Sequence, residues 1–225
     1  MSTLVLFSGG LDSAVLAAHE AQSAPVLPVY VSVGLAWEAA EVAMVEQLLR
    51  APVFVNRTEP LSRVEFTMRD VYPSTHWAIR GVPPAYDTPD EDVYLSGRNL
   101  VLLTKAGVIA ARHGAHRIAI GPLAGNPFPD ARPAFFSAMA VAMSLALDHA
   151  IEIAAPFLEW EKAAVMRRGV ALGVPFELTL SCMNPGIIDG LPHHCGVCSK
   201  CRERRDAFAA AGVSDPSAYA NKSPR

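Results

Sequence analysis

The sequence has no uninterrupted apolar run long enough to span a bilayer, and its first residues lack the basic segment and cleavage site of a secretion signal. It also lacks an excess of basic residues. The 19 Lys and Arg stand against 22 Asp and Glu, for a formal net charge of -3. This balance disfavours a protein that binds nucleic acid through bulk charge. We therefore expect a cytoplasmic protein with no membrane partner.

Cysteine is scarce and unevenly placed. The 4 cysteines of the 225 residues all lie in the last quarter, at Cys182, Cys195, Cys198 and Cys201. Disulfide frameworks are typical of small secreted chains, whereas this spacing suits a tetrahedral structural zinc site. A redox pair, an iron–sulfur cluster and buried inert thiols are the alternatives, and no surrounding redox motif favours them. We expect His193 and His194 to be loop residues beside the metal, not ligands.

The most informative motif lies near the N-terminus, where an apolar β-like run leads through Ser-Gly-Gly into a helical pattern. Glycines let the backbone approach a ligand closely, and the helix start offers free N–H groups and a positive dipole end. The lysine of a Walker A loop is absent. The motif predicts an oligophosphate-binding loop, with a merely connecting turn as the alternative. The residues expected to hold the phosphates are Phe7, Ser8, Gly9, Gly10, Leu11, Asp12 and Ser13.

Short β-like runs alternate with longer helical patterns along the chain. Strands are expected at 4–7, 26–31, 53–55, 117–120 and 151–153, and helices at 11–21, 38–49, 99–113, 133–148 and 162–172. This alternation predicts an α/β fold, a Rossmann-like parallel sheet with helices on both faces, whose ligands bind beyond the carboxyl ends of the strands. We expect this domain to cover 1–178 and a zinc-binding segment to cover 179–225.

Two segments break this rhythm. The proline-rich stretch 72–89 is expected to be an excursion over the active site or a dimer contact. The Gly- and Pro-rich stretch 180–201 must be organised by something other than apolar packing. The tail after Gly212 is expected to be loosely held.

Together these motifs resemble those of the 7-cyano-7-deazaguanine synthases, the QueC family of the PP-loop ATP pyrophosphatase superfamily. The resemblance runs through most of the chain. Besides the phosphate loop and the cysteine pattern, it is carried by Gly97-Arg98-Asn99-Leu100-Val101, by Pro129-Asp130-Ala131-Arg132 and by the segment 158–163 with its lysine, Lys162. It implies a fold like that of the adenine nucleotide alpha hydrolases.

The resemblance also implies an activity. Such enzymes use ATP, Mg²⁺ and ammonia to convert 7-carboxy-7-deazaguanine through an adenylate and an amide into the nitrile, in a queuosine-type pathway. It implies a zinc-containing homodimer. The catalytic residues expected are Asp12, Arg98 and Lys162, and the substrate contacts expected are Asn99, Asp130 and Arg132. Helix caps are the alternative roles for Asp12, Asn99 and Asp130, and surface exposure is the alternative for Arg98 and Lys162.

Other positions depart from the family pattern. Residues 33–37 read Val-Gly-Leu-Ala-Trp where the family has Tyr-x-Gln-x-His, Ser96 replaces a proline, and 121–128 lacks the acidic substrate loop. Trp37, Phe128 and Trp160 are aromatic side chains that could stack on a flat base. Two alternatives therefore stay open: a paralogue that adenylates another carboxylate, on a small molecule or a protein partner, and a zinc-knuckle protein that binds nucleic acid.

Overall fold

A single parallel sheet organises the chain. The computed structural model describes residues 1–221, and its five strands lie in the order β3-β2-β1-β4-β5. Their bounds are Thr3–Leu6 for β1, Val26–Ser32 for β2, Ser62–Glu65 for β3, Arg117–Ala119 for β4 and Glu152–Ala154 for β5. Strand β1 lies in the centre, where Leu4 is aligned with Leu27 of β2 and Ile118 of β4. The predicted parallel α/β fold is confirmed.

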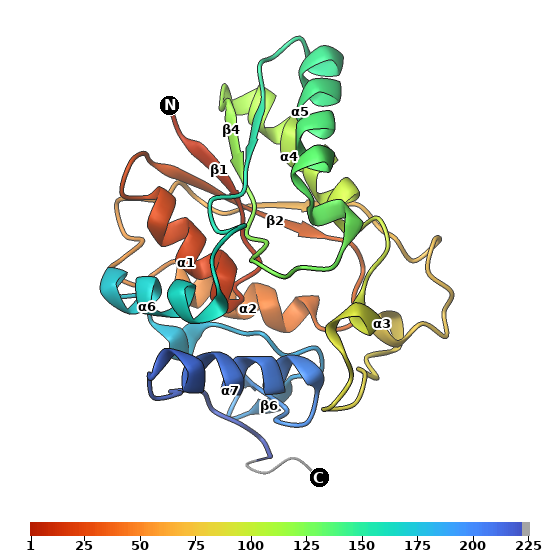
Figure 1. Ribbon diagram of the computed structural model, residues 1–225, viewed down its shortest axis with the longest axis vertical. Helices are drawn as coiled ribbons and strands as arrows, with labels where there is room; N and C mark the ends of the chain where they lie inside the picture. The colour runs from red at the N-terminus through yellow and green to blue at the C-terminus, as the bar shows by residue number, and fades with distance from the viewer. Residues whose placement is uncertain (222–225) are drawn as a thin grey trace.

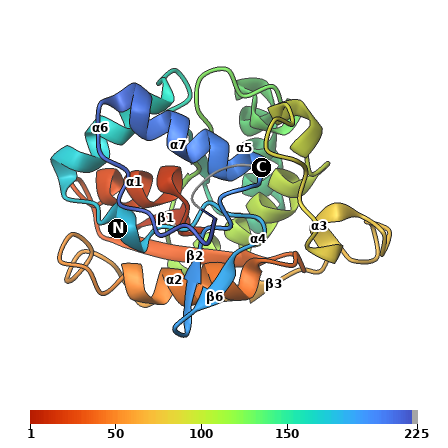
Figure 2. The ribbon, with the colours of Figure 1, turned by 90° about the horizontal axis from the view of Figure 1, so that it is seen from below.

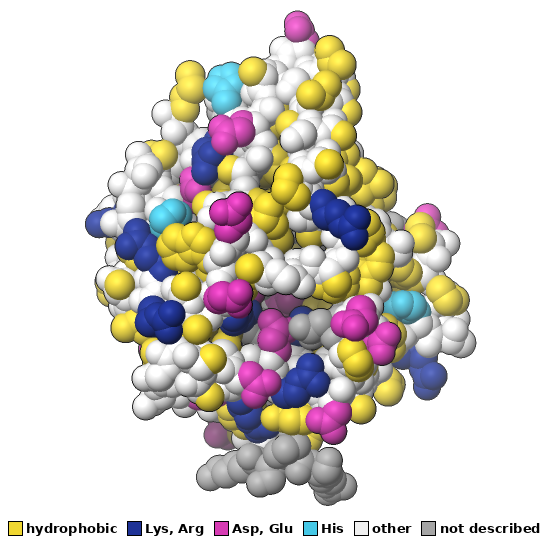
Figure 3. All heavy atoms as spheres, in the orientation of Figure 1, with side chains coloured by type: hydrophobic (Ala, Val, Ile, Leu, Met, Phe, Trp, Pro, Cys, Tyr) yellow, Lys and Arg dark blue, Asp and Glu magenta, His cyan; other side chains and the backbone are white. Residues whose placement is uncertain are grey.

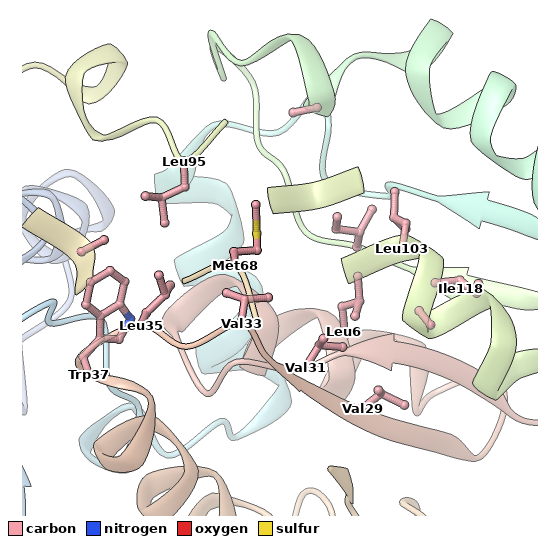
Figure 4. Packing of buried hydrophobic residues seen from close by; sticks show 14 of the residues in the cluster. Leu6, Val29, Val31, Val33, Leu35, Trp37, Met68, Leu95, Leu103 and Ile118 are labelled. Atoms are coloured by element: carbon pink, nitrogen blue, oxygen red, sulfur yellow. The ribbon is translucent and has the colours of Figure 1, made fainter. Parts of the chain in front are cut away.

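Helices cover both faces of the sheet (Figure 1). Side chains of β1 alternate between the two faces, because successive residues of a strand point in opposite directions. Leu4 and Leu6 join the core under α4 (Arg98–His113) and α5 (Pro133–Leu147), and Figure 4 shows Leu6 packed with Leu103 and Ile118 there. Val5 joins the opposite core, under α1 (Leu11–Glu20), α2 (Glu38–Leu48) and α6 (Lys162–Leu172).

The third strand does not lie where the sequence pattern placed it. Residues 53–55 form turns, so the predicted strand there is wrong, and β3 occupies Ser62–Glu65 instead. Phe54 is fully buried, and its ring packs edge-on against the ring of Phe7, with ring centres 5.9 Å apart. Strand β3 is an edge strand with alternating half-buried and exposed residues. Its sequence therefore carries little apolar signal.

The C-terminal segment packs on the α1–α6 side of the sheet. Helix α7 (Ser199–Ala211) lies beside α6, as Figure 2 shows, and an antiparallel hairpin joins β6 (Gly186–Ile188) to β7 (Leu191–His193). The expectation of a loosely held tail is wrong as far as residue 221. The N–H of Ala220 donates to the carbonyl of His194 at 2.8 Å, and the Arg205 guanidinium lies 4.2 Å from the centre of the Tyr219 ring. The division at residue 178 stays a prediction.

Shorter helical elements complete the chain: α3 (Trp77–Arg80), η1 (Asp90–Val93), η2 (Pro129–Ala131) and η3 (Phe176–Leu178). Among the helices of residues 1–221, none is both long and apolar enough to cross a membrane.

Candidate active site and metal centre

The loop after β1 has the backbone geometry of an anion cradle. Gly9 has a φ of +76°, and a Cβ there would lie 2.8 Å from a methyl group of Val45, so glycine is required at this position. Gly10 caps α1 with its backbone alone, and no side chain binds the free N–H groups of the first turn. The hydroxyls of Ser8 and Ser13 lie 3.2 Å apart beside them. Free N–H groups, hydroxyl donors and a helix dipole together suit a phosphate group.

Asp12 and Lys162 form the central ion pair of this region. Both lie in the first turns of their helices, α1 and α6, and Lys162 Nζ donates to Asp12 Oδ2 at 2.6 Å. Lys162 also donates to Glu203 Oε1 of α7 at 3.1 Å, and Glu203 binds Lys200 at 2.5 Å. Asp12 is no helix cap, because Gly10 occupies that position and α1 has no side-chain cap. The alternative role suggested for Asp12 is therefore wrong.

The charges in this network are strongly held. Burial by itself lowers the pKa of Lys162, but the carboxylates of Asp12 and Glu203 outweigh this effect and raise it. Burial likewise raises the pKa of Glu203, and the ammonium groups of Lys162 and Lys200 outweigh it and lower the pKa to about 2. Lys162 and Glu203 therefore both stay charged at neutral pH.

Asp130 fixes the start of α4. Its Oδ2 accepts a hydrogen bond from the backbone N–H of Asn99 at 3.1 Å, while the Asn99 amide donates to the Asp130 carbonyl at 3.0 Å. Asp130 therefore caps α4, not the helix that follows it in sequence. Burial raises the pKa of Asp130, and the hydrogen bonds from Asn99 oppose this shift.

Three buried polar atoms of these residues have no hydrogen-bond partner within residues 1–221: Asp12 Oδ1, Arg98 Nε and Asp130 Oδ1. Buried polar groups are nearly always paired in folded proteins. All three side chains line one cavity. The site is therefore built for a polar ligand that supplies the missing partners.

Two adjoining cavities meet at the phosphate loop. The strand-end cavity, of about 290 Å³, lies between the loop, the end of β2 and the residues after β4. The aromatic cavity, of about 300 Å³, lies between the loop, α2, the excursion over 72–97 and α7. Both cavities share the side chains of Ser8, Asp12, Arg98, Asn99 and Phe128. In Figure 3 the surface is hollowed between the α4–α5 part and the C-terminal part, and charged side chains gather around the hollow.

Stacked rings give the aromatic cavity its shape. Trp37 stacks on Trp77 of the excursion, with ring centres 5.8 Å apart and planes 7° from parallel. Tyr94 stacks on Phe128 at 4.7 Å. Trp160 lies elsewhere, against Phe157. Flat apolar walls of this kind suit a flat heteroaromatic ligand.

The four cysteines form one buried cluster. Their Sγ atoms all lie within 4.8 Å of one another, at 3.9 Å for Cys182–Cys198, 3.8 Å for Cys195–Cys201 and 3.5 Å for Cys198–Cys201. Four thiolates at about 2.3 Å around a tetrahedral Zn²⁺ stand about 3.8 Å apart. The cluster therefore fits zinc, and four sulfur ligands leave no open position on the metal.

Backbone N–H groups support the cluster. Those of Asn184 and Cys195 donate to the Cys182 sulfur, at 3.3 and 3.2 Å. Hydrogen bonding among the four thiols lowers the pKa of Cys195 and Cys198 and raises that of Cys182 and Cys201, and a bound metal requires all four as thiolates. His194 accepts a hydrogen bond from the Ser181 N–H at 3.2 Å, so it lies beside the cluster, as expected. His193 ends strand β7, so the expectation of a loop residue is wrong for it.

Arg204 joins α7, which carries Cys201, to the segment that precedes Cys182 and to the C-terminal tail. Its guanidinium is fully buried, at 1% exposure. It donates to Thr179 Oγ1 at 2.9 Å, to the Phe176 carbonyl at 2.8 Å and to Ser217 Oγ at 2.5 Å. A buried guanidinium this fully bonded acts as a structural pin.

The structure separates the expected site residues into two groups. The phosphate loop, Arg98, Asn99, Asp130 and Lys162 meet around the two cavities. Arg132 is exposed and lines neither cavity. Two acidic wall residues escaped sequence reasoning, Glu41 and Glu203, because nothing local distinguishes a buried glutamate on a helix from a solvated one. The pairing of Glu38 and Glu41 on one face of α2 is the one signal that could have found the first.

Parallel strands, a glycine-rich loop at a helix start and a buried four-cysteine cluster together define an α/β protein with a loop suited to phosphate and a cluster that could hold a metal ion. The family model described as "Queuosine biosynthesis protein QueC" matches residues 2–212. The chain belongs to this family, and the resemblance seen in its motifs is confirmed.

Several relatives match along their whole length. A 7-cyano-7-deazaguanine synthase of Syntrophotalea carbinolica is 34% identical over 232 residues, covering 99% of this chain and 98% of the relative. One of Methanothrix thermoacetophila is 33% identical, covering 95% and 96%. A synthase of Azoarcus sp. is 41% identical over 133 residues, about half of each chain at 56% and 57%.

Proposed function

We propose that this protein is an ATP-dependent 7-cyano-7-deazaguanine synthase. The observation that carries the proposal is the junction of the two cavities, where Asp12, Arg98 and Asp130 each present an unpartnered buried polar atom beside the phosphate loop. A nucleotide in the strand-end cavity and a flat carboxylated base in the aromatic cavity would meet at this junction. Full-length relatives that carry the synthase name support it, and they disfavour the paralogue and nucleic-acid alternatives.

The first step we infer is adenylation. A carboxylate oxygen of 7-carboxy-7-deazaguanine attacks the α-phosphorus of ATP, and the bond to pyrophosphate breaks. Charge builds on the leaving pyrophosphate, where Arg98 and Lys162 stabilise it from two helix starts. Mg²⁺ held by Asp12 and the phosphates would neutralise further charge.

The second step is attack by ammonia on the acyl adenylate, which releases AMP and leaves an amide. Activation of the amide oxygen by a second ATP, followed by loss of AMP, gives the nitrile. Asn99 and Asp130 would orient the base. Arg132, which is exposed and lines neither cavity, is given no role in these steps.

The cysteine cluster is proposed to hold zinc in a structural role, since its four sulfurs complete the coordination. Metal analysis of the purified protein tests this, with one zinc per chain expected and none after Cys198→Ser. Wild-type protein that folds without bound metal would contradict the assignment.

A homodimer is the proposed assembly. Helix α5 is apolar on all sides, yet Val141 and Leu145 are 61% and 81% exposed, and Val108 of the adjacent α4 is 43% exposed. Such a patch is typical of an association surface. Sedimentation should give a mass twice that of the 24.0 kDa chain. For Leu145→Glu the measured mass should fall to that of a single chain.

The decisive assay combines the protein with Mg-ATP, ammonium and 7-carboxy-7-deazaguanine, and follows nucleotide and base by mass spectrometry. AMP and the nitrile are expected, and Asp12→Asn should abolish both. Untouched ATP with folded, zinc-loaded protein would reject the synthase activity.

A further inference from the structure

One carboxylate in the wall of the aromatic cavity takes part in none of the steps above. Glu41 lies in the first turn of α2, and only 8% of the residue is exposed. Its Oε2 accepts a hydrogen bond of 2.8 Å from the Tyr30 hydroxyl of β2. Within the described part of the chain it forms no ion pair. A buried acid without a counter-ion needs a reason to be there, because burial penalises its charged form.

The other acids of this cavity are already engaged. Asp12 and Glu203 share the ammonium group of Lys162, and Asp130 caps α4. Glu41 is therefore the acid in this wall whose proton can come and go without breaking an ion pair or a helix cap.

The surroundings of Glu41 bring the pKa of its carboxyl group close to neutral pH. Burial raises the pKa of Glu41 to about 7, while the charge of Arg98 and hydrogen bonds from Tyr30 and Trp37 limit the rise. Glu38 of the same helix adds to it. The elements η3 and β7 also contact α2, but their titratable residues, Glu177 and His193, do not line the cavity.

Glu41 lies close to the phosphate loop. Its backbone carbonyl lies 3.8 Å from where a Cβ of Gly9 would be, so this turn of α2 packs directly on the phosphate loop. The indoles of Trp37 and Trp77 line the same cavity. A carboxylate beside aromatic rings suits a small cation, because the charge and the ring faces both attract it.

We propose that Glu41 is the ammonium site of this enzyme, binding the ion beside the acyl adenylate and accepting its proton. This rests on the proposed function, in which ammonia is consumed. At neutral pH ammonia exists almost entirely as ammonium, whose lone pair is unavailable until a base removes a proton. A base whose pKa lies near the working pH serves that purpose best.

The step balances as follows in atoms and charge. Ammonium transfers one proton to the Glu41 carboxylate, and the freed lone pair forms the C–N bond. The bond from the carbonyl carbon to the AMP oxygen breaks, and its electron pair leaves with AMP. The nitrogen then loses a second proton to solvent, which leaves the amide, AMP and a protonated Glu41 that returns its proton to solvent.

A second use of this carboxylate is reading the paired N–H donors of the base. Each carboxylate oxygen has two lone pairs, so such a contact is compatible with the hydrogen bond from the Tyr30 hydroxyl to Oε2. The two uses differ in the step they serve: base recognition acts in adenylation, whereas ammonium binding acts only after it.

The test compares Glu41→Gln and Tyr30→Phe with Glu46→Gln, an exposed residue of α2 that binds Arg63 on the surface. Two assays separate the steps: carboxylate-dependent exchange of pyrophosphate into ATP without ammonium, and product formation against ammonium concentration from pH 6 to 9. For Glu41→Gln we expect exchange within about 3-fold of wild type and a kcat/KM for ammonium about 100-fold lower at pH 7. The deficit should shrink toward pH 9, where free ammonia is abundant.

Tyr30→Phe should move the acidic limb of the wild-type profile to higher pH, since its hydrogen bond lowers the pKa of Glu41. Equal loss of exchange and of ammonium use in Glu41→Gln would overturn the proposal in favour of base recognition. An unchanged ammonium dependence would overturn it as well. If wild type shows no carboxylate-dependent exchange, the proposed function itself fails, and this assignment falls with it.

Discussion

Replacing Lys162 by methionine removes the cation that the phosphate loop and the metal-binding helix share. If Lys162 stabilises the charge that develops on pyrophosphate, the variant should lose about 10²–10³-fold in kcat, or about 2.7–4 kcal/mol of transition-state stabilisation. Methionine keeps the length of the buried stem and removes the charge alone, so packing should change little.

The structure also sets the cost to stability. Lys162 Nζ lies 2.6 Å from Asp12 and 3.1 Å from Glu203. In the variant Glu203 still has its ion pair with Lys200 at 2.5 Å, so only Asp12 loses its partner. Removing the partner of one buried acceptor costs about 1–3 kcal/mol. The 3–5 kcal/mol of a fully buried pair does not apply, because 22% of Lys162 and 29% of Asp12 are exposed. For a chain of this size the loss corresponds to a Tm about 2–12 °C lower.

Pyrophosphate exchange at 25 °C and thermal unfolding without ATP measure the two effects separately. Lys105→Met is the matched control, since this lysine of α4 lies over Phe66, away from both cavities. A Lys162→Met protein that exchanges pyrophosphate within 3-fold of wild type would refute the role of this lysine. A rate loss that vanishes at temperatures where the variant is fully folded would refute it too.

Three further changes test other parts of the structure. Gly9→Ala places a Cβ 2.8 Å from Val45 at a φ of +76°. The ATP affinity measured by calorimetry should fall at least about 10-fold, and the unfolding free energy should fall by about 1–2 kcal/mol. Unchanged affinity would contradict the role of this loop in binding phosphate. Arg204→Met leaves the hydrogen-bond acceptors of a fully buried guanidinium unpaired. Urea unfolding should show an unfolding free energy about 3–5 kcal/mol lower. A decrease below about 1 kcal/mol would contradict the structural role of this arginine. Between pH 4.5 and about 7 folded Glu41 holds a proton that the unfolded chain has released. The unfolding free energy of wild type should therefore fall by at most about 3 kcal/mol as pH rises through this window, and Glu41→Gln should flatten the fall.

Much of the fold was predictable because its signals are local. The loop around Gly9 and the helix that begins at Leu11 were predicted from neighbouring residues in the sequence. The helices that cover the sheet were predicted in the same way. The third strand was misplaced because an edge strand is half exposed and carries little apolar pattern, whereas Phe54 is a buried apolar residue in a turn. Burial and strand pairing are separate properties, and hydrophobicity reports only the first.

The sequence by itself determined the phosphate loop, the alternation of strands and helices and the four-cysteine cluster, because each depends on residues close together in the chain. Tertiary structure alone decided which charges meet. Lys162 binds Asp12 across 150 positions and Glu203 across 41, Arg132 lies on the surface, and Glu41 is buried against Tyr30. A side chain's partners and its exposure depend on elements brought beside it by the packing of the whole sheet, and no periodicity along the chain records them.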